Sequence, residues 1–138
     1  MDGINAIELI DLYINKDERG DLIAIQFQKH LNLSIERSFL VFGKKDFTRG
    51  NHAHIKCNQF LCCISGSCEV KCDDGENSCS RILCDPSKIL KIPNMIWSSQ
   101  NYKAKNTILL VLCDLEYSEE DYIREYKAFL EYKKHDIN

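Results

Sequence analysis

The chain has 138 residues, of which 44% are hydrophobic and 28% charged, and its formal net charge is −3. This balance is typical of a soluble globular protein and excludes a disordered chain, and the length suits a single domain over residues 1–138. An acidic net charge gives no reason to expect nucleic acid or an anionic membrane as a partner. Since the sequence contains neither a membrane-spanning apolar run nor a signal-peptide pattern, we expect a cytoplasmic protein.

Up to residue 115 the chain reads as short strands separated by turn signals. Apolar and polar residues alternate in several of them, and Asp74-Gly75 between two short segments predicts a hairpin. This many short strands predict an all-β sandwich or barrel. The expected strands span 6–14, 21–28, 33–42, 58–64, 67–72, 79–84, 88–92 and 107–115.

Residues 118–134 follow a different pattern, that of a helix. Ser118 precedes three acidic residues, as at a capped helix N-terminus. Apolar residues then recur at helical spacing, and Lys133 and Lys134 lie at the end. We expect one C-terminal α-helix on the outside of the β-structure.

The eight cysteines do not have the spacing of a zinc knuckle or a redox pair. Most of them lie in apolar runs such as FLCCIS and LLVLCD. Cysteine in such a setting behaves as a small hydrophobic residue. We therefore interpret the cysteines as core residues.

The segment TRGNHAHIKCNQFLCCISG, residues 48–66, contains two histidines with one residue between them. In an extended strand, residues two apart point to the same face. His52 and His54 are thus aimed at one place, beside Arg49 and Gly50. A single histidine in a core strand is usually structural, but two on one face indicate a functional site.

The spacing of His52, His54, Gln59 and Gly66 matches the first cupin motif, in which an acidic metal ligand stands at the position of Gln59. Pro93 fits the second cupin motif, whose ligand position falls on Ser98. An amide and a hydroxyl supply neither the charge nor the imidazole that divalent metal sites favour. The sequence therefore predicts a cupin jelly-roll β-barrel without a metal.

Two imidazoles without a metal suit general acid–base chemistry, because histidine titrates near neutral pH. One of them can remove a proton from the carbon beside a ketone and return it elsewhere. The enolate that develops needs hydrogen-bond donors nearby. Arg49 or Gln59 can supply these donors.

The same segment resembles the RG-x-HAH-K signature of the dTDP-4-keto-6-deoxyglucose 3,4-ketoisomerases, a metal-free cupin family. Further blocks resemble the family in the same order, and together they cover most of residues 17–130. They are DERGDLIAIQ, SIERSFLVF, CDDG, IPNMIW and LEYSEEDYIREYKAFL.

The resemblance implies an antiparallel jelly roll and a homodimer that exchanges N-terminal strands. It also implies conversion of a dTDP-linked 4-keto-6-deoxy sugar to its 3-keto isomer without a cofactor, before a separate aminotransferase acts at C3. In this reaction His52 and His54 shuttle protons between C3 and C4 through an enediol. Arg19, Arg37 and Arg49 match family arginines that are candidates for binding sugar or diphosphate oxygens.

Three further positions bear on substrate binding. Trp97 either lines the cavity or closes the barrel core. Position 98 is commonly His or Arg in the family but is Ser here, and Arg19 resembles members that give the galacto-configured product. Because both positions are tied to stereochemistry at C4, the resemblance favours the galacto product. Leu40 stands where many relatives carry tyrosine.

Three other functions remain open. A cupin 3,5-epimerase also removes protons beside a ketone, and only the closer match to RGNHAH argues against it. A non-catalytic sugar-binding cupin predicts ligand binding without proton exchange. A metal-dependent cupin oxygenase predicts iron or nickel retained by the purified protein.

Overall fold

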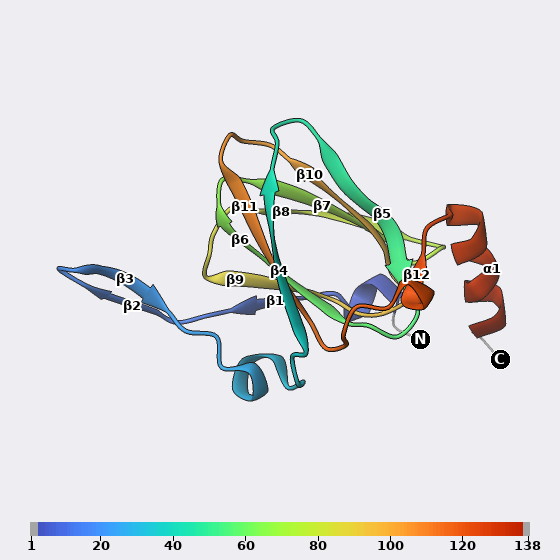
Figure 1. The fold of residues 1–138 in the computed structure, drawn as a ribbon, viewed down its shortest axis with the longest axis horizontal. Coiled ribbons are helices and arrows are strands. Elements are labelled where there is room, and N and C mark those ends of the chain that lie inside the picture. The colour runs from blue at the N-terminus through green and yellow to red at the C-terminus, as the bar shows by residue number, and fades with distance from the viewer. Residues whose placement is uncertain (1–2, 137–138) are drawn as a thin grey trace.

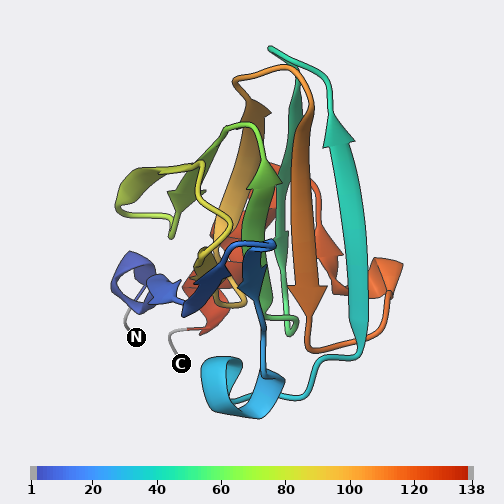
Figure 2. The same cartoon turned by 90° about the vertical axis from the view of Figure 1, so that its left-hand side faces the viewer.

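The computed structural model describes residues 3–136, which form two antiparallel five-stranded sheets that face each other (Figures 1 and 2). The first sheet has the order β1-β9-β6-β11-β4, with bounds Glu8–Asp11, Lys88–Ile92, Gln59–Ser65, Thr107–Cys113 and Arg37–Gly43. The second has the order β12-β5-β10-β7-β8, with bounds Tyr122–Ile123, Thr48–His54, Trp97–Tyr102, Cys68–Asp73 and Ser78–Leu83. The sheets remain separate rather than closing into one barrel, and the predicted all-β jelly roll is confirmed as a sandwich.

The main core lies between the two sheets, because each strand turns alternate side chains inward. In β7, Cys68, Val70 and Cys72 are buried between the more exposed Glu69 and Lys71. All eight cysteines are free thiols, and six of them are buried. This confirms that most of the cysteines are core residues.

A second apolar cluster covers the outer face of the first sheet. Phe60 and Cys62 of β6 point away from the main core and pack against Leu12 and Leu31 from the N-terminal segment. Both faces of β6 are therefore buried, which explains its continuous apolar run.

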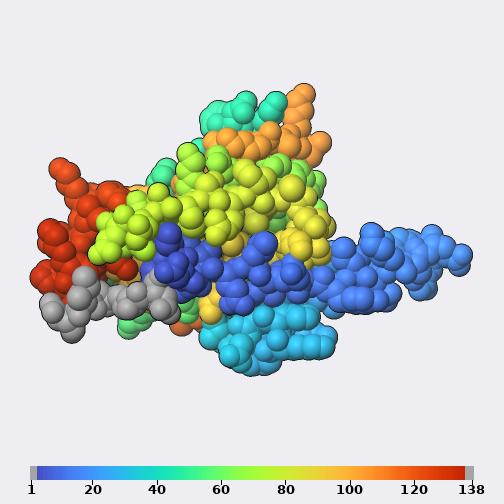
Figure 3. All heavy atoms as spheres, turned by 180° about the vertical axis from the view of Figure 1, so that it is seen from behind, coloured from blue at the N-terminus to red at the C-terminus, as the bar shows by residue number. Residues whose placement is uncertain are grey.

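The N-terminal segment departs from the two strands predicted there. The expected strand 6–14 is split into β1 and β2 (Ile14–Asp17), because Leu12 turns into the second cluster. The expected strand 21–28 is also wrong at its end. It stops with β3 (Gly20–Ile23) and continues into a π-helical turn, Phe27–Leu31, that ends at Asn32 in the left-handed region. Strands β2 and β3 form a hairpin that projects from the body (Figure 3).

The predicted hairpin at Asp74-Gly75 is confirmed, and it joins β7 to β8. Gly75 has a φ of +98°, which favours glycine. The Asp74 carboxylate accepts hydrogen bonds from the backbone N–H groups of Glu76 and Asn77, both at 2.8 Å. The same carboxylate accepts one from Ile4, near the 3₁₀ turn Gly3–Ala6.

The predicted helix 118–134 is correct only in its second half. Helix α1 spans Tyr126–Asp136, whereas Glu119–Asp121 form a 3₁₀ turn and Tyr122–Ile123 form β12. Ser118 precedes the 3₁₀ turn without a side-chain capping bond. Tertiary contacts explain the difference, because β12 pairs with β5 and Asp121 is hydrogen-bonded to the chain after β5.

Helix α1 lies outside the sandwich, beside β12 (Figure 1). Its Phe129 is fully buried in a third cluster with Ala53, Met95 and Ile123. The helix therefore covers the outer side of the strand that carries both histidines. Within the described residues, no helix has the length and apolar character needed to cross a membrane.

Candidate active site

A cavity of about 790 Å³ opens between the two sheets, at the end where β4, β5 and β10 meet the C-terminal segment. Its wall combines apolar side chains of the first sheet with polar side chains of the second. The polar and aromatic lining residues used below are Arg49, His52, Gln59, Gln100, Tyr122 and Arg124. Of the two histidines, His52 lines this cavity, and His54 lies behind it with 5% exposure.

A bulge in β5 sets the orientation of the two histidines. The register of β5 against β10 shifts between Ser98 and Ser99, opposite Gly50 and Asn51. These two residues have φ values of +93° and +59°. A bulge of this kind re-aims the side chains that follow it. The imidazole rings of His52 and His54 then lie 5.2 Å apart, edge to face.

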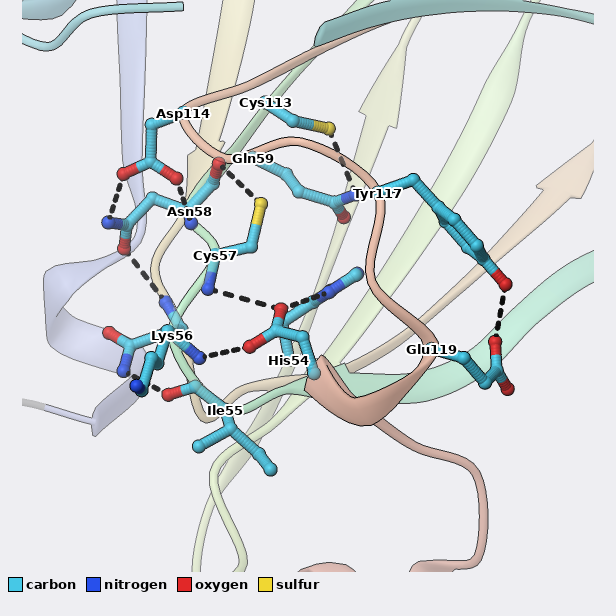
Figure 4. Close-up of polar contacts among 12 residues, drawn as sticks. His54, Ile55, Lys56, Cys57, Asn58, Gln59, Cys113, Asp114, Tyr117 and Glu119 are labelled. Carbon is cyan, nitrogen blue, oxygen red and sulfur yellow. Dashed lines mark hydrogen bonds and ion pairs between the residues drawn. The ribbon is translucent and has the colours of Figure 1, made fainter. Parts of the chain in front are cut away.

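Asp121 fixes the orientation of His54. Its Oδ2 atom lies 3.0 Å from Nδ1 of His54, and its carboxylate also accepts hydrogen bonds from the backbone N–H groups of Lys56 and Cys57 (Figure 4). A carboxylate accepts, so Nδ1 carries the proton and Nε2 has a free lone pair. Among the described residues, the buried Nε2 atom has no hydrogen-bond partner.

Burial keeps both imidazoles neutral. Desolvation, and after it the neighbouring His54, lower the pKa of His52 to about 4. Desolvation also lowers the pKa of His54, although the hydrogen bond to Asp121 opposes this effect. Both rings are therefore proton acceptors at neutral pH.

The C-terminal segment contributes two residues to the cavity that sequence reasoning missed. The ring of Tyr122 contacts both imidazoles, with centroids 4.3 Å from His54 and 5.0 Å from His52. The guanidinium of Arg124 lies 4.4 Å from the centre of the Tyr122 ring and is held by two hydrogen bonds to Glu119. Arg124 and then Tyr117 lower the pKa of Glu119 to about 2, so Glu119 stays charged.

Gln59 and Arg37 meet at the thiol of Cys113. The Gln59 amide lies 3.5 Å and the Arg37 guanidinium 3.4 Å from Sγ of Cys113. The neighbouring Cys57 thiol, together with the hydrogen bonds from Arg37 and Gln59, lowers the pKa of Cys113. Gln59 lines the cavity, whereas Arg37 lies behind the wall between the rings of Phe39 and Tyr117. Among the described residues, the buried Nε atom of Arg37 has no partner.

The remaining predicted substrate-binding residues are spread over three places. Arg49 lines the cavity. Ser98 is buried beneath Gln100, whose amide lies 3.2 Å from the serine hydroxyl. Trp97 does not line this cavity, and its ring packs under α1, 5.4 Å from the ring of Tyr126.

Arg19 also lies away from the cavity of its own protomer. It stands at the tip of the β2–β3 hairpin, where its side chain is 86% exposed. Its guanidinium pairs with Asp17 at 2.7 Å, and that partner raises the pKa of Arg19.

Comparisons with known proteins agree on one family. The family model described as FdtA, WxcM-like, C-terminal matches residues 5–134. The chain is 37% identical over 117 residues, 84% of each chain, to the TDP-4-oxo-6-deoxy-alpha-D-glucose-3,4-oxoisomerase of Aneurinibacillus thermoaerophilus.

Solved structures give the same result. A 3,4-ketoisomerase from Helicobacter canadensis superposes with a TM-score of 0.90 at 35% identity, covering 94% of this chain and 98% of that one. A histidine-to-asparagine variant of the 3,4-ketoisomerase QdtA from Thermoanaerobacterium thermosaccharolyticum, in complex with TDP-4-keto-6-deoxyglucose, gives 0.91 at 30% identity, with 95% and 96% covered. The rmlC epimerase of Mycobacterium tuberculosis, at 17% identity, a TM-score of 0.76 and 86% and 68% coverage, shares the fold alone.

The histidine pair, the cavity beside it and these similarities lead to one assignment. The chain belongs to the TDP-sugar 3,4-ketoisomerase family.

Proposed function

We propose that this protein converts dTDP-4-keto-6-deoxyglucose to a dTDP-3-keto-6-deoxyhexose by proton transfer at His52 and His54. The observation that carries the proposal is the pair of neutral imidazoles beside the cavity, of which His52 lines it and His54 is buried behind it and held by Asp121. A relative with 37% identity is named as an oxoisomerase of this sugar nucleotide, which supports the choice of substrate.

The reaction transfers protons at C3 and C4 and needs no oxidant or reductant. A neutral imidazole removes the proton from C3, the electron pair forms the C3–C4 double bond, and O4 takes up a proton to give the enediol. O3 then loses its proton while C4 gains one, which leaves the ketone at C3. Every proton removed is returned, so the isomerisation balances without a cofactor.

The tautomer of His54 fits the role of base. With its proton on Nδ1 facing Asp121, the ring offers the lone pair of Nε2, and the imidazolium that forms is stabilised by the carboxylate. His52 lies 5.2 Å away and lines the cavity, so it is placed to exchange the second proton. Gln59, also in the wall, can donate to the developing enediolate oxygen.

Two arginines of the cavity suit the diphosphate. Arg49 and Arg124 line the same cavity, and a guanidinium can bind two phosphate oxygens at once. Arg37 is half-buried behind the wall, where its guanidinium lies 3.4 Å from the Cys113 thiol. We therefore assign nucleotide binding to Arg49 and Arg124 before Arg37.

We further propose a homodimer in which the β2–β3 hairpin of one protomer lies against the other. The hairpin projects from its own body and exposes Tyr13 and Leu22 by 80% and 61%. Such an exchange would deliver Arg19 to the partner's cavity. Arg19 in that place favours the galacto configuration at C4. The 3-keto product is suited to amination at C3 in the synthesis of a 3-amino sugar.

The test is proton NMR of dTDP-4-keto-6-deoxyglucose incubated in D₂O with chelator-treated protein. We expect deuterium at C3 or C4 and new 3-keto sugar signals, whose coupling constants give the C4 configuration. Exchange at C5 would instead identify a 3,5-epimerase. An unchanged spectrum with bound nucleotide would identify a sugar-binding cupin and overturn the proposal.

A further inference from the structure

Three potential metal ligands meet behind the histidine pair, on the side away from the cavity. Nδ1 of His54, Sγ of Cys57 and a carboxylate oxygen of Asp121 all lie within 4.8 Å of one another. Figure 4 shows the His54 ring and the backbone N–H of Cys57 on the carboxylate of Asp121, with the Cys57 sulfur on the side of Asn58. Nitrogen, thiolate sulfur and carboxylate oxygen are the ligand types that Zn²⁺ prefers.

A tetrahedral ion requires its ligand atoms to lie close together. Zn–N and Zn–O bonds of about 2.0 Å and a Zn–S bond of about 2.3 Å place neighbouring ligand atoms about 3.5 Å apart. Nδ1 of His54 and Oδ2 of Asp121 lie 3.0 Å apart, and the Cys57 thiol, which donates to the Asn58 carbonyl at 3.4 Å, must turn toward them to complete the site. Backbone N–H groups of Lys56 and Cys57 hold the carboxylate in place, as the outer partners of metal ligands do.

Of these three residues only His54 falls on a cupin metal position. Two other motif positions that hold metal in cupins fall on Gln59 and Ser98, which are engaged with Cys113 and Gln100. The group of His54, Cys57 and Asp121 instead uses the other ring nitrogen of the histidine and faces the 3₁₀ turn. The side chain of Asp121 is 13% exposed, so an ion can reach it from solvent.

We propose that His54, Cys57 and Asp121 bind a thiophilic divalent cation such as Zn²⁺ or Cd²⁺, and that the bound ion switches off the isomerase. The inhibition rests on the proposed function, whereas the site does not.

The inhibition follows from the tautomer of His54. A cation on Nδ1 displaces the proton that faces Asp121, and that proton moves to Nε2, so the ring can no longer accept one from the sugar. The Cys57 thiol must give up its proton to bind, so each ion that enters releases one proton. Binding therefore strengthens as the pH rises. Mg²⁺ prefers oxygen ligands and will not compete.

The binding test uses Co²⁺ added to chelator-treated protein, because Co²⁺ takes zinc sites and reports a bound thiolate by a near-ultraviolet charge-transfer band. We expect one equivalent of Co²⁺ to give this band and Zn²⁺ to abolish it. Cys57→Ala and Cys57→Ser should each lose the band, and the use of two variants guards against a folding defect in one. Cys84→Ala removes the exposed thiol and should keep the band.

The activity test is made on the same proteins. Zn²⁺ should inhibit the parent and Cys84→Ala proteins, while the two Cys57 variants turn over substrate and resist inhibition. A band that persists without Cys57, or its absence from the parent protein, would overturn the site. A cobalt band in a parent protein that has no isomerase activity would support the metal site and contradict the proposed function.

Discussion

Asp121 determines which nitrogen of His54 carries the proton. Replacing it by Asn keeps the shape but removes the charge that stabilises the imidazolium. We expect Asp121→Asn to lower kcat by about 10²-fold or more, since a positioned acid–base group contributes 10² to 10⁴. Because Asp121 raises the pKa of His54 against desolvation, the acidic limb of the kcat profile should also move to lower pH.

The control for this prediction is Asp114→Asn. Asp114 holds the same loop through two hydrogen bonds from Asn58 at 2.8 Å, but it does not touch a histidine (Figure 4). Its replacement should cost stability without shifting the pH profile. An equal loss of kcat in both variants, with unchanged profiles, would mean that Asp121 only supports the loop.

Buried histidine also makes stability depend on pH. An unfolded chain protonates His52 below its ordinary pKa of 6.5, whereas the folded protein does so only near 4. Between these values the unfolded state binds more protons. The free energy of unfolding is therefore highest above pH 6.5 and should fall by about 2 kcal/mol toward pH 4, allowing for partial exposure of the ring.

Urea unfolding between pH 7.5 and 4.5, at fixed protein concentration, measures this effect. His52→Gln should flatten the slope only in part, because the pKa of His54 is lowered in the same direction. His135→Gln changes an exposed histidine at the end of α1 and serves as the matched control. A slope that is the same in all three proteins would contradict burial of a neutral His52.

At the scale of the element, the bulge in β5 connects sequence to site geometry. A Cβ at Gly50 would lie 2.8 Å from the Gln100 amide oxygen and 3.0 Å from the Ser98 carbonyl. Its φ of +93° would also strain any other residue. We expect Gly50→Ala to lose about 1–3 kcal/mol of stability and to displace the histidines, with a clear loss of kcat.

Gly75→Ala is the control for Gly50→Ala, because it introduces the same backbone strain without displacing the histidines. Gly75 has a similar φ of +98°, but a Cβ there makes only ordinary contacts, the nearest at 3.6 Å, far from the histidines in the β7–β8 hairpin. It should lose stability and keep its kcat. Chemical denaturation and steady-state kinetics on both variants decide the point. Equal kinetics in the two would show that the bulge does not set the site.

The elements that could be predicted from the sequence are those with a local signal. The alternating strand β7, the continuous apolar run of β11 and the Asp74-Gly75 turn could all be predicted. Strand β10, WSSQNY, is polar because it lines the cavity, so its pattern did not indicate a strand. The acidic run at 119–121 has a helical N-terminal signal, yet tertiary hydrogen bonds to Asp121 override it.

The same contrast applies to the site. His52 and His54 are separated by one residue, so strand alternation was enough to bring them together. Asp121, Tyr122 and Arg124 come from a segment nearly seventy residues later, and only the pairing of β12 with β5 places them at the histidines. No local pattern distinguishes Asp121 from its acidic neighbours. The sequence left the place of Trp97 open, because an aromatic residue fits either face of a sandwich.

At the scale of the whole molecule, the described fold leaves apolar surface that one protomer does not cover. Strand β4 is an edge of the first sheet, and its Phe42 is 74% exposed. The projecting hairpin exposes Tyr13 and Leu22. An open edge and an unsupported hairpin are both unfavourable in a monomer. They are accounted for together if two chains exchange their hairpins.

Leu22→Glu tests this arrangement, because a charge on the hairpin would be buried in the dimer and free in the monomer. We expect light scattering to show a dimer for the parent protein and a monomer for Leu22→Glu, with reduced activity. Ile82→Glu, at a residue of β8 that is 57% exposed, should stay dimeric and active. Arg19→Ala should also stay dimeric but bind substrate less tightly, because the hairpin then carries no guanidinium to the partner's cavity. A monomeric parent protein, or a Leu22→Glu protein that remains dimeric, would contradict the proposed hairpin exchange. It would also contradict the proposed role of Arg19.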